Sequence, residues 1–143
     1  MVVRIGTEIG GYGSRATPTG TERVMREVHR HVTSFFESDV HELLPVVTSS
    51  LQTKPDRPLH PYFASDPMLN RTPVDIDDLD CLLILDPLAP IDFRSIDSLR
   101  RRRRLPVISM IYDVLPLQRA DWFVPGAASA FRRRVQEVLH CSD

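Results

Sequence analysis

The chain has 143 residues, of which 42% are hydrophobic and 26% charged, and its formal net charge is -1. This balance fits one globular domain over residues 1–143 and excludes a collagen-like or grossly disordered chain. The near-neutral charge argues against general nucleic-acid binding, and the two cysteines show no metal-ligand spacing, so we expect no metal and no cofactor. Met1 to Ile9 lacks the long apolar run of a signal peptide, which predicts a cytoplasmic protein.

The first half of the chain alternates between strand and helix signals. Val2 to Ile9 is rich in β-branched residues and leads into glycines, which predicts a strand followed by a loop. From Thr21 onward, apolar residues recur at steps of three and four and predict an amphipathic helix, capped by Thr19 or Thr21. The apolar face of this helix is predicted to hold Val24, Val28, Val32, Phe35 and Phe36. Val40 to Thr48 is predicted as a second strand that Pro45 interrupts or offsets.

The second half begins with a proline-rich loop excursion over residues 52–75, because prolines disfavour helix and cannot donate to a strand ladder. Order is expected to return with a continuous apolar run that predicts a buried strand. The remaining elements are predicted to be a strand at Cys81 to Leu85, a helix at Ile91 to Arg104, a strand at Val107 to Tyr112 and a helix at Gly126 to His140.

Strands that alternate with helices predict an α/β fold with a doubly wound, Rossmann-like parallel sheet covered by helices on both faces. We expect the four strands in the order 3-2-1-4, so that the carboxyl ends of the first and fourth strands flank the point where ligands bind in open sheets. This order would bring the glycine loop after Ile9 close to Tyr112 and Asp113.

Two groups of residues are candidates for binding or catalysis. The glycine-rich loop from Gly10 to Gly20 could offer backbone amides to a phosphate at a helix N-terminus. It lacks the dinucleotide fingerprint and the Walker lysine, so a flexible connection is the alternative. Asp113 ends a buried strand beside Tyr112, where sheets present ligand-binding residues, and a turn or capping aspartate is the alternative.

Two further residue groups favour a structural interpretation. The arginines at 100–104 could bind an anionic membrane or another phosphate-rich surface, but they are more typical of a solvated helix C-terminus. The five histidines show no spacing typical of a metal site and are expected at the surface.

Two segments resemble the amino-terminal domain of retaining, family-4-like glycosyltransferases of the GT-B fold. Thr19 to Val28 is similar to their glycine loop and first helix. Ile111 to Leu117, followed by Trp122-Phe123 and Phe131, is similar to the fourth strand and the helix after it. Many members of the family have histidine where this chain has Tyr112, so a histidine-dependent role does not transfer.

The resemblance implies a glycosyltransferase domain that acts within a longer chain and is inactive alone. Its partners would be a nucleotide-sugar donor, held mainly by a second domain, and a glycan or lipid-linked acceptor. Peripheral contact with the inner face of the membrane is a further expectation. The resemblance gives the catalytic role to Asp113 and Tyr112. It gives donor-phosphate binding to Gly20, Thr21 and Gly11.

Two other functions stay open. Asp80 to Pro90 resembles the phosphoacceptor segment of a receiver domain, with Asp86 as the acceptor, although Glu8-Ile9-Gly10 lacks the acidic pair expected upstream. Alternatively, the proline-rich segment and the arginine run could serve a non-catalytic interaction module.

Overall fold

The computed structural model describes residues 2–10, 12, 19–36, 40–48, 63–86, 88, 91–112 and 114–143. Within these ranges, four strands form one parallel sheet in the order β2-β1-β3-β4. The strands are β1 (Val3–Glu8), β2 (His41–Val46), β3 (Cys81–Ile84) and β4 (Val107–Ser109).

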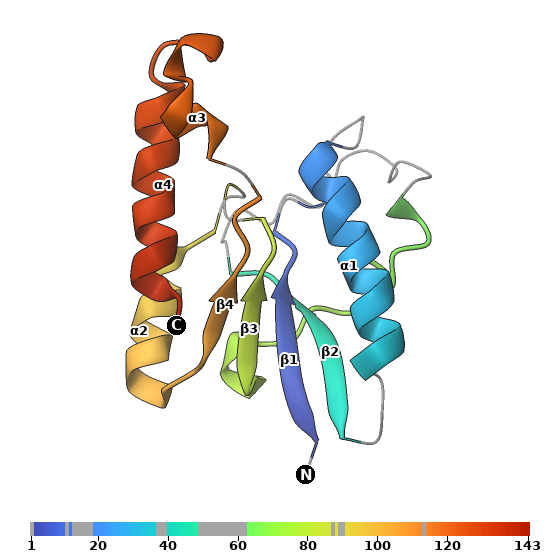
Figure 1. Cartoon of the computed structure of the whole chain (residues 1–143). Helices are drawn as coiled ribbons and strands as arrows, with labels where there is room; N and C mark the ends of the chain where they lie inside the picture. Colours follow the sequence, from blue (N-terminus) through green and yellow to red (C-terminus); the bar gives the residue numbers. More distant parts are fainter. Residues whose placement is uncertain are drawn as a thin grey trace.

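Helices lie on both faces of this sheet (Figure 1). The helix α1 (Gly20–Phe36) covers one face, whereas α2 (Phe93–Arg103) and α4 (Ala127–Cys141) pack together on the other. Along the chain, the short helix α3 (Leu115–Gln118) and the 3-10 turn η3 (Ala120–Trp122) connect β4 to α4. A second 3-10 turn, η2 (Ile76–Asp78), precedes β3. The predicted Rossmann-like α/β class is therefore confirmed.

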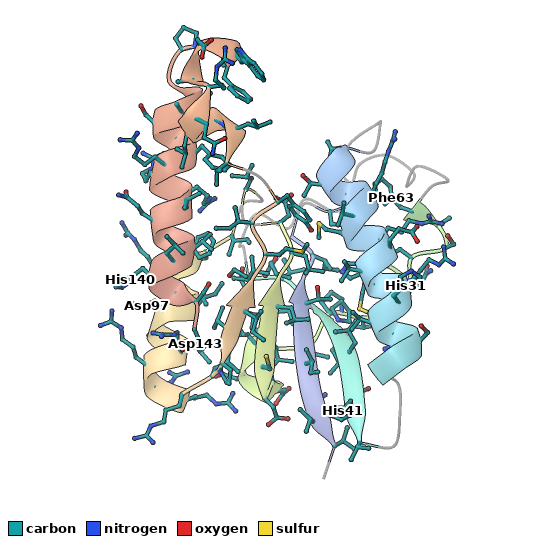
Figure 2. The ribbon with its side chains drawn as sticks, in the orientation of Figure 1. His31, His41, Phe63, Asp97, His140 and Asp143 are labelled. Atoms are coloured by element: carbon teal, nitrogen blue, oxygen red, sulfur yellow. The ribbon has the colours of Figure 1, made fainter. Side chains whose placement is uncertain are left out.

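The strand alternation divides the apolar side chains into two cores. Leu44, Leu82 and Ile84 belong to the core beneath α2 and α4. Leu43 and its neighbours on the opposite face pack with Met25 of α1 and with the buried Phe63, which Figure 2 places beside this helix. Neighbouring residues of one strand thus face opposite layers, as expected for a parallel sheet that is covered on both sides.

The expected strand order is wrong, because β3 separates β1 from β4. A single residue explains the difference. Val74 forms an isolated parallel bridge with Val46, and its amide donates to the Pro45 carbonyl at 2.9 Å. Since β1 occupies the other edge of β2, Val74 lies at the outer edge. Counting it as a one-residue strand gives the order 3-2-1-4-5 of dinucleotide-binding folds, with the switch point between β1 and β3.

Two local predictions also change. The strand β2 runs through Pro45 without interruption, in register with β1, because the proline's missing amide faces the outer edge next to Val74. Val28 and Val32 of α1 pack against the core as predicted, but Val24 is 39% exposed, and Met25 and His29 of the same helix are buried. The side chains of Phe35 and Phe36 lie outside the described residues.

The proline-rich excursion and the fourth strand differ from their predictions in extent. Residues 49–62 lie outside the described part, and residues 63–80 contain turns, the bridge at Val74 and η2. The strand β4 ends at Ser109, three residues earlier than expected, so Tyr112 lies in the loop beyond it.

Candidate functional site

A cavity of about 220 Å³ opens at the carboxyl edge of the sheet. Four polar residues line it from four different segments: Thr21 in the first turn of α1, Asp86 after β3, Tyr112 after β4 and Arg134 in α4. Apolar side chains form most of the remaining wall, including Phe123 and Phe131. An apolar cavity with a few convergent polar groups at this edge is typical of ligand sites in open α/β sheets.

Tyr112 presents a hydroxyl group without a hydrogen-bond partner among the described residues, although that atom is buried. Burial of the side chain, together with the negative charge of Asp86, raises the pKa of Tyr112 to about 12. The phenol therefore stays protonated at neutral pH and can donate a hydrogen bond to a ligand oxygen. It is unsuited to act as a general base.

Asp86 and Arg134 supply opposite charges to the same cavity. One Asp86 oxygen, Oδ1, accepts the amide of Leu88 at 3.0 Å, which closes a small turn after β3. Arg134 pairs with Glu137 at 2.8 Å, and its guanidinium lies 4.9 Å from the centre of the Phe93 ring. These contacts hold both charged groups in place, and the cavity thereby combines an acceptor, a cation and the Tyr112 donor.

The N-terminus of α1 is closed by a reciprocal pair of side chains. The amide of Thr19 donates to Glu22 Oε2 at 2.8 Å, and the amide of Glu22 donates to Thr19 Oγ1 at 3.2 Å. This capping box identifies Thr19 as the capping residue and places a buried carboxylate at the positive end of the helix. A phosphate at this terminus would therefore depend on the amides of Gly20 and Thr21.

The predicted site residues fall into three groups. Thr21 and Tyr112 line the same cavity, so the structure brings together two positions separated by most of the chain. Gly20 is exposed and begins α1 directly before Thr21. Gly11 and Asp113 lie outside the described residues.

The glycine loop contains a hydrogen bond that competes with its predicted role. The amide of Gly10 donates to Glu8 Oε1 at 2.7 Å, and the amide of Thr48 donates to Glu8 Oε2 at 2.8 Å. Burial raises the pKa of Glu8 above its usual value, although these two amides oppose the shift. Glu8 thus ties the ends of β1 and β2 together beside the switch point, and the Gly10 amide is not free for a phosphate.

Beneath α1 lies a buried polar network that the sequence analysis missed. His29 Nδ1 lies 3.1 Å from Asp66 Oδ2, and His29 Nε2 lies 3.2 Å from Thr7 Oγ1. The hydroxyl of Tyr12 donates to the same Asp66 oxygen at 2.6 Å, and the amide of Met68 donates to Asp66 Oδ1 at 2.8 Å. His29 is completely buried, so the prediction of a surface histidine is wrong at this position.

The order of Thr7, His29 and Asp66 resembles that of a nucleophile, a base and an orienting carboxylate. All three residues are 0% exposed, however, and none lines the cavity at the sheet edge. A substrate cannot reach Thr7 in this arrangement. We therefore assign the network a structural role: it joins β1, α1, Tyr12 of the glycine loop and the segment around Asp66.

Burial alone would raise the pKa of Asp66, but its hydrogen bond with His29, the charge of that ring and the Tyr12 and Met68 hydrogen bonds together lower it. Asp66 is therefore a carboxylate that is stabilised in its charged form inside the core.

Most of the arginine run is paired with nearby carboxylates. Each of the four arginines at 100–103 forms an ion pair: with Asp143, with Asp97 and twice with Asp77. Figure 2 shows Asp97, His140 and Asp143 close together at this end of the helices. The run therefore belongs to the C-terminus of α2, as the favoured interpretation expected.

In the ranges that the structure describes, no three His, Cys, Asp or Glu residues gather so that they could hold a metal ion. None of the described helices is long and apolar enough to cross a membrane.

Comparisons of the chain with family models, with curated proteins and with solved structures found no match.

Proposed function

We propose that this domain binds a sugar-containing ligand and serves as the acceptor-side domain of a glycosyltransferase. One observation carries the proposal: Thr21 and Tyr112, which belong to the two segments that resemble such enzymes, line one cavity at the carboxyl edge of the sheet. The Rossmann-like fold and the switch point beside this edge support it.

The wall of the cavity suits a sugar chemically. A pyranose has hydroxyl groups around its rim and apolar C–H groups on its faces. Tyr112 can donate to a hydroxyl oxygen, Asp86 can accept a hydroxyl proton, and Phe123 or Phe131 can cover an apolar face. Arg134 would add a donor for a charged or polar substituent.

The donor phosphates would lie toward the start of α1. Because Thr19 and Glu22 cap each other, the available groups are the amides of Gly20 and Thr21 and the Thr21 hydroxyl. Such amides stabilise the negative charge that develops on a departing diphosphate. In this proposal a second domain holds most of the nucleotide, and the chain by itself transfers no sugar.

The test is a titration followed by NMR of the backbone amides. UDP-glucose, GDP-mannose and methyl α-glucoside are added separately, and we expect the amide signals of Thr21, Tyr112 and Arg134 to shift for at least one probe. Tyr112→Phe should weaken that binding roughly fivefold to tenfold by removing one hydrogen bond, without unfolding the domain. Leu139→Ser, on the exposed side of α4, is the matched control. Absence of shifts at millimolar concentrations of every probe would reject the proposal.

One observation favours phosphoryl acceptance as a second function. Asp86 follows β3, and the end of β3 lies beside the switch point between β1 and β3. Against it, the Glu8 carboxylate at the end of β1 is buried and engaged by two backbone amides. Acetyl phosphate should modify Asp86 if this function is real, and Asp86→Asn should abolish the modification. An unmodified wild-type chain would exclude it.

A further inference from the structure

An exposed apolar surface lies at the end of the molecule beyond the carboxyl edge of the sheet. We call it the tip and define it as Val114, Leu115, Trp122, Phe123 and Val124. Trp122 is 61% exposed and Val124 is 75% exposed, which is unusual for side chains of this size and type. Figure 1 shows α3 and the turn before α4 projecting past the strands, so the tip stands clear of the sheet.

Arginines lie beside the tip. The guanidinium of Arg119 lies 4.1 Å from the centre of the Trp122 ring and pairs with Asp121. Arg132 and Arg133, in the first half of α4, form no ion pair with any described residue. A broad groove of about 760 Å³ connects Phe123 with Arg94 and Arg133. Three arginines line this groove, Arg94, Arg133 and Arg134, against one acidic residue, Glu137, which pairs with Arg134.

The tip differs from the other apolar and basic surfaces because it has both exposed apolar side chains and nearby arginines. Ile108 and Met110 of the β4 region are also exposed, but they line none of the arginine-bordered groove. The arginines of α2 at 100–103 each pair with a carboxylate, and no exposed aromatic side chain lies among them. Only the tip joins exposed aromatic side chains to unpaired cations within the described residues.

We propose that the tip binds an anionic lipid bilayer, with Trp122 and Val124 entering the interface and Arg132 and Arg133 contacting lipid phosphates. Tryptophan and phenylalanine are favoured at the boundary between headgroups and acyl chains. Arginine binds phosphate oxygens in a fork geometry and is attracted by an anionic leaflet. Symmetric docking of a second copy through the same patch would instead bring the two sets of arginines together, and like charges repel.

The single tryptophan of the chain makes the proposal directly measurable. The fluorescence of Trp122 is recorded while vesicles of phosphatidylcholine, with or without 30% phosphatidylglycerol as an added anionic lipid, are titrated into the protein. We expect a blue shift with the anionic vesicles only, weakened by added salt because the arginine attraction is screened. An unshifted emission with both vesicle types would overturn the proposal.

Substitutions identify which residues contact the bilayer. Val124→Asp should weaken partitioning roughly tenfold by placing a charge at the interface. Arg132→Glu with Arg133→Glu should weaken it at least as much, since each surface arginine contributes roughly a fivefold factor. Leu139→Asp is the control, because Leu139 is 66% exposed near the other end of α4. Equal losses for Leu139→Asp and Val124→Asp would overturn the proposal, as would a blue shift that grows with protein concentration in the absence of lipid, which would indicate a second copy as the partner.

Discussion

At the scale of single residues, His29 is the side chain whose removal should matter most. His29→Phe fills much of the same volume but leaves the Asp66 carboxylate and the Thr7 hydroxyl buried without their imidazole partner. Leaving these two buried polar groups without a partner costs about 1–3 kcal/mol of unfolding free energy for each of them. Urea denaturation measures the loss. His31→Phe is the control, because Figure 2 shows His31 on the same helix and it is exposed, so we expect a change below about 0.5 kcal/mol. Equal effects of the two substitutions would contradict the structural role of the network.

Two glycines should respond in opposite ways to alanine. An added methyl group at Gly6 would overlap Leu79 and come within 2.8 Å of Val46, so Gly6→Ala should cost about 1–3 kcal/mol. Nothing lies within 4 Å of the same methyl group at Gly20, in the first turn of α1, so Gly20→Ala should leave stability unchanged or raise it by up to about 1 kcal/mol. Thermal unfolding of both variants checks the prediction. A destabilised Gly20→Ala would show that the start of α1 needs glycine for folding.

The sequence could not reveal the buried network, because its members lie in four separate segments and only the spacing of Met25 and His29 indicated a buried face. Met25 and His29 are one turn apart on α1, but the valines of the same helix offered a more apolar face. A polar residue is buried only when partners satisfy it, and those partners, Thr7 and Asp66, are 22 and 37 residues away. Pairings of this kind become visible only in the folded chain.

At the scale of elements, the N-terminus of α1 offers a test of which threonine caps it. Thr19→Ala removes the hydroxyl that accepts the Glu22 amide and should cost about 1 kcal/mol. Thr21→Ala leaves the capping box intact and should change stability by less than about 0.5 kcal/mol. Circular dichroism during urea denaturation gives both values. If Thr21→Ala is the more costly change, the cap is misassigned, and the amides available to a phosphate change with it.

The topology of the elements was predictable only in part. The alternating pattern and the apolar runs correctly indicated four strands and the helices on both faces, because burial on two sides selects continuous apolar strands. The strand order depended on Val74, and one residue has no periodicity to detect. Pro45 was expected to disturb β2 because proline has no amide to donate to a strand ladder. Its orientation toward the outer edge, which makes it harmless there, is set by tertiary pairing and leaves no local signal in the sequence.

The candidate site combines a predictable and an unpredictable part. The ends of parallel strands meet at one edge, so the proximity of Thr21 and Tyr112 followed from the fold class, although the expected order was wrong. Arg134 gave no local signal, because its place in the cavity depends on how α4 packs against the sheet.

At the scale of the whole molecule, Glu8 and Asp66 should shape the dependence of stability on pH. The pKa of Glu8 is raised by burial, so the folded state holds this proton more tightly than the unfolded state, and stability rises as pH falls from neutral through the folded pKa. That gain is complete near the unfolded pKa of about 4.3. The pKa of Asp66 is lowered, so its contribution is full above an unfolded pKa of about 3.9 and is lost as pH falls through the folded value.

These opposite shifts predict a stability maximum in mildly acidic solution, with a gentle decline toward neutral pH and a steep loss in strong acid. The exposed carboxylates Asp92 and Asp143, whose pKa values are also lowered, add to the acid loss in the same direction. Urea denaturation at a series of pH values measures the profile. Glu8→Gln should remove the decline toward neutral pH, because the variant has no proton to release there, and Asp66→Asn should flatten the acid side at a lower overall stability. If the wild-type and Glu8→Gln profiles stay parallel between about pH 4.5 and 7, then Glu8 does not carry the proton linkage that its buried position implies.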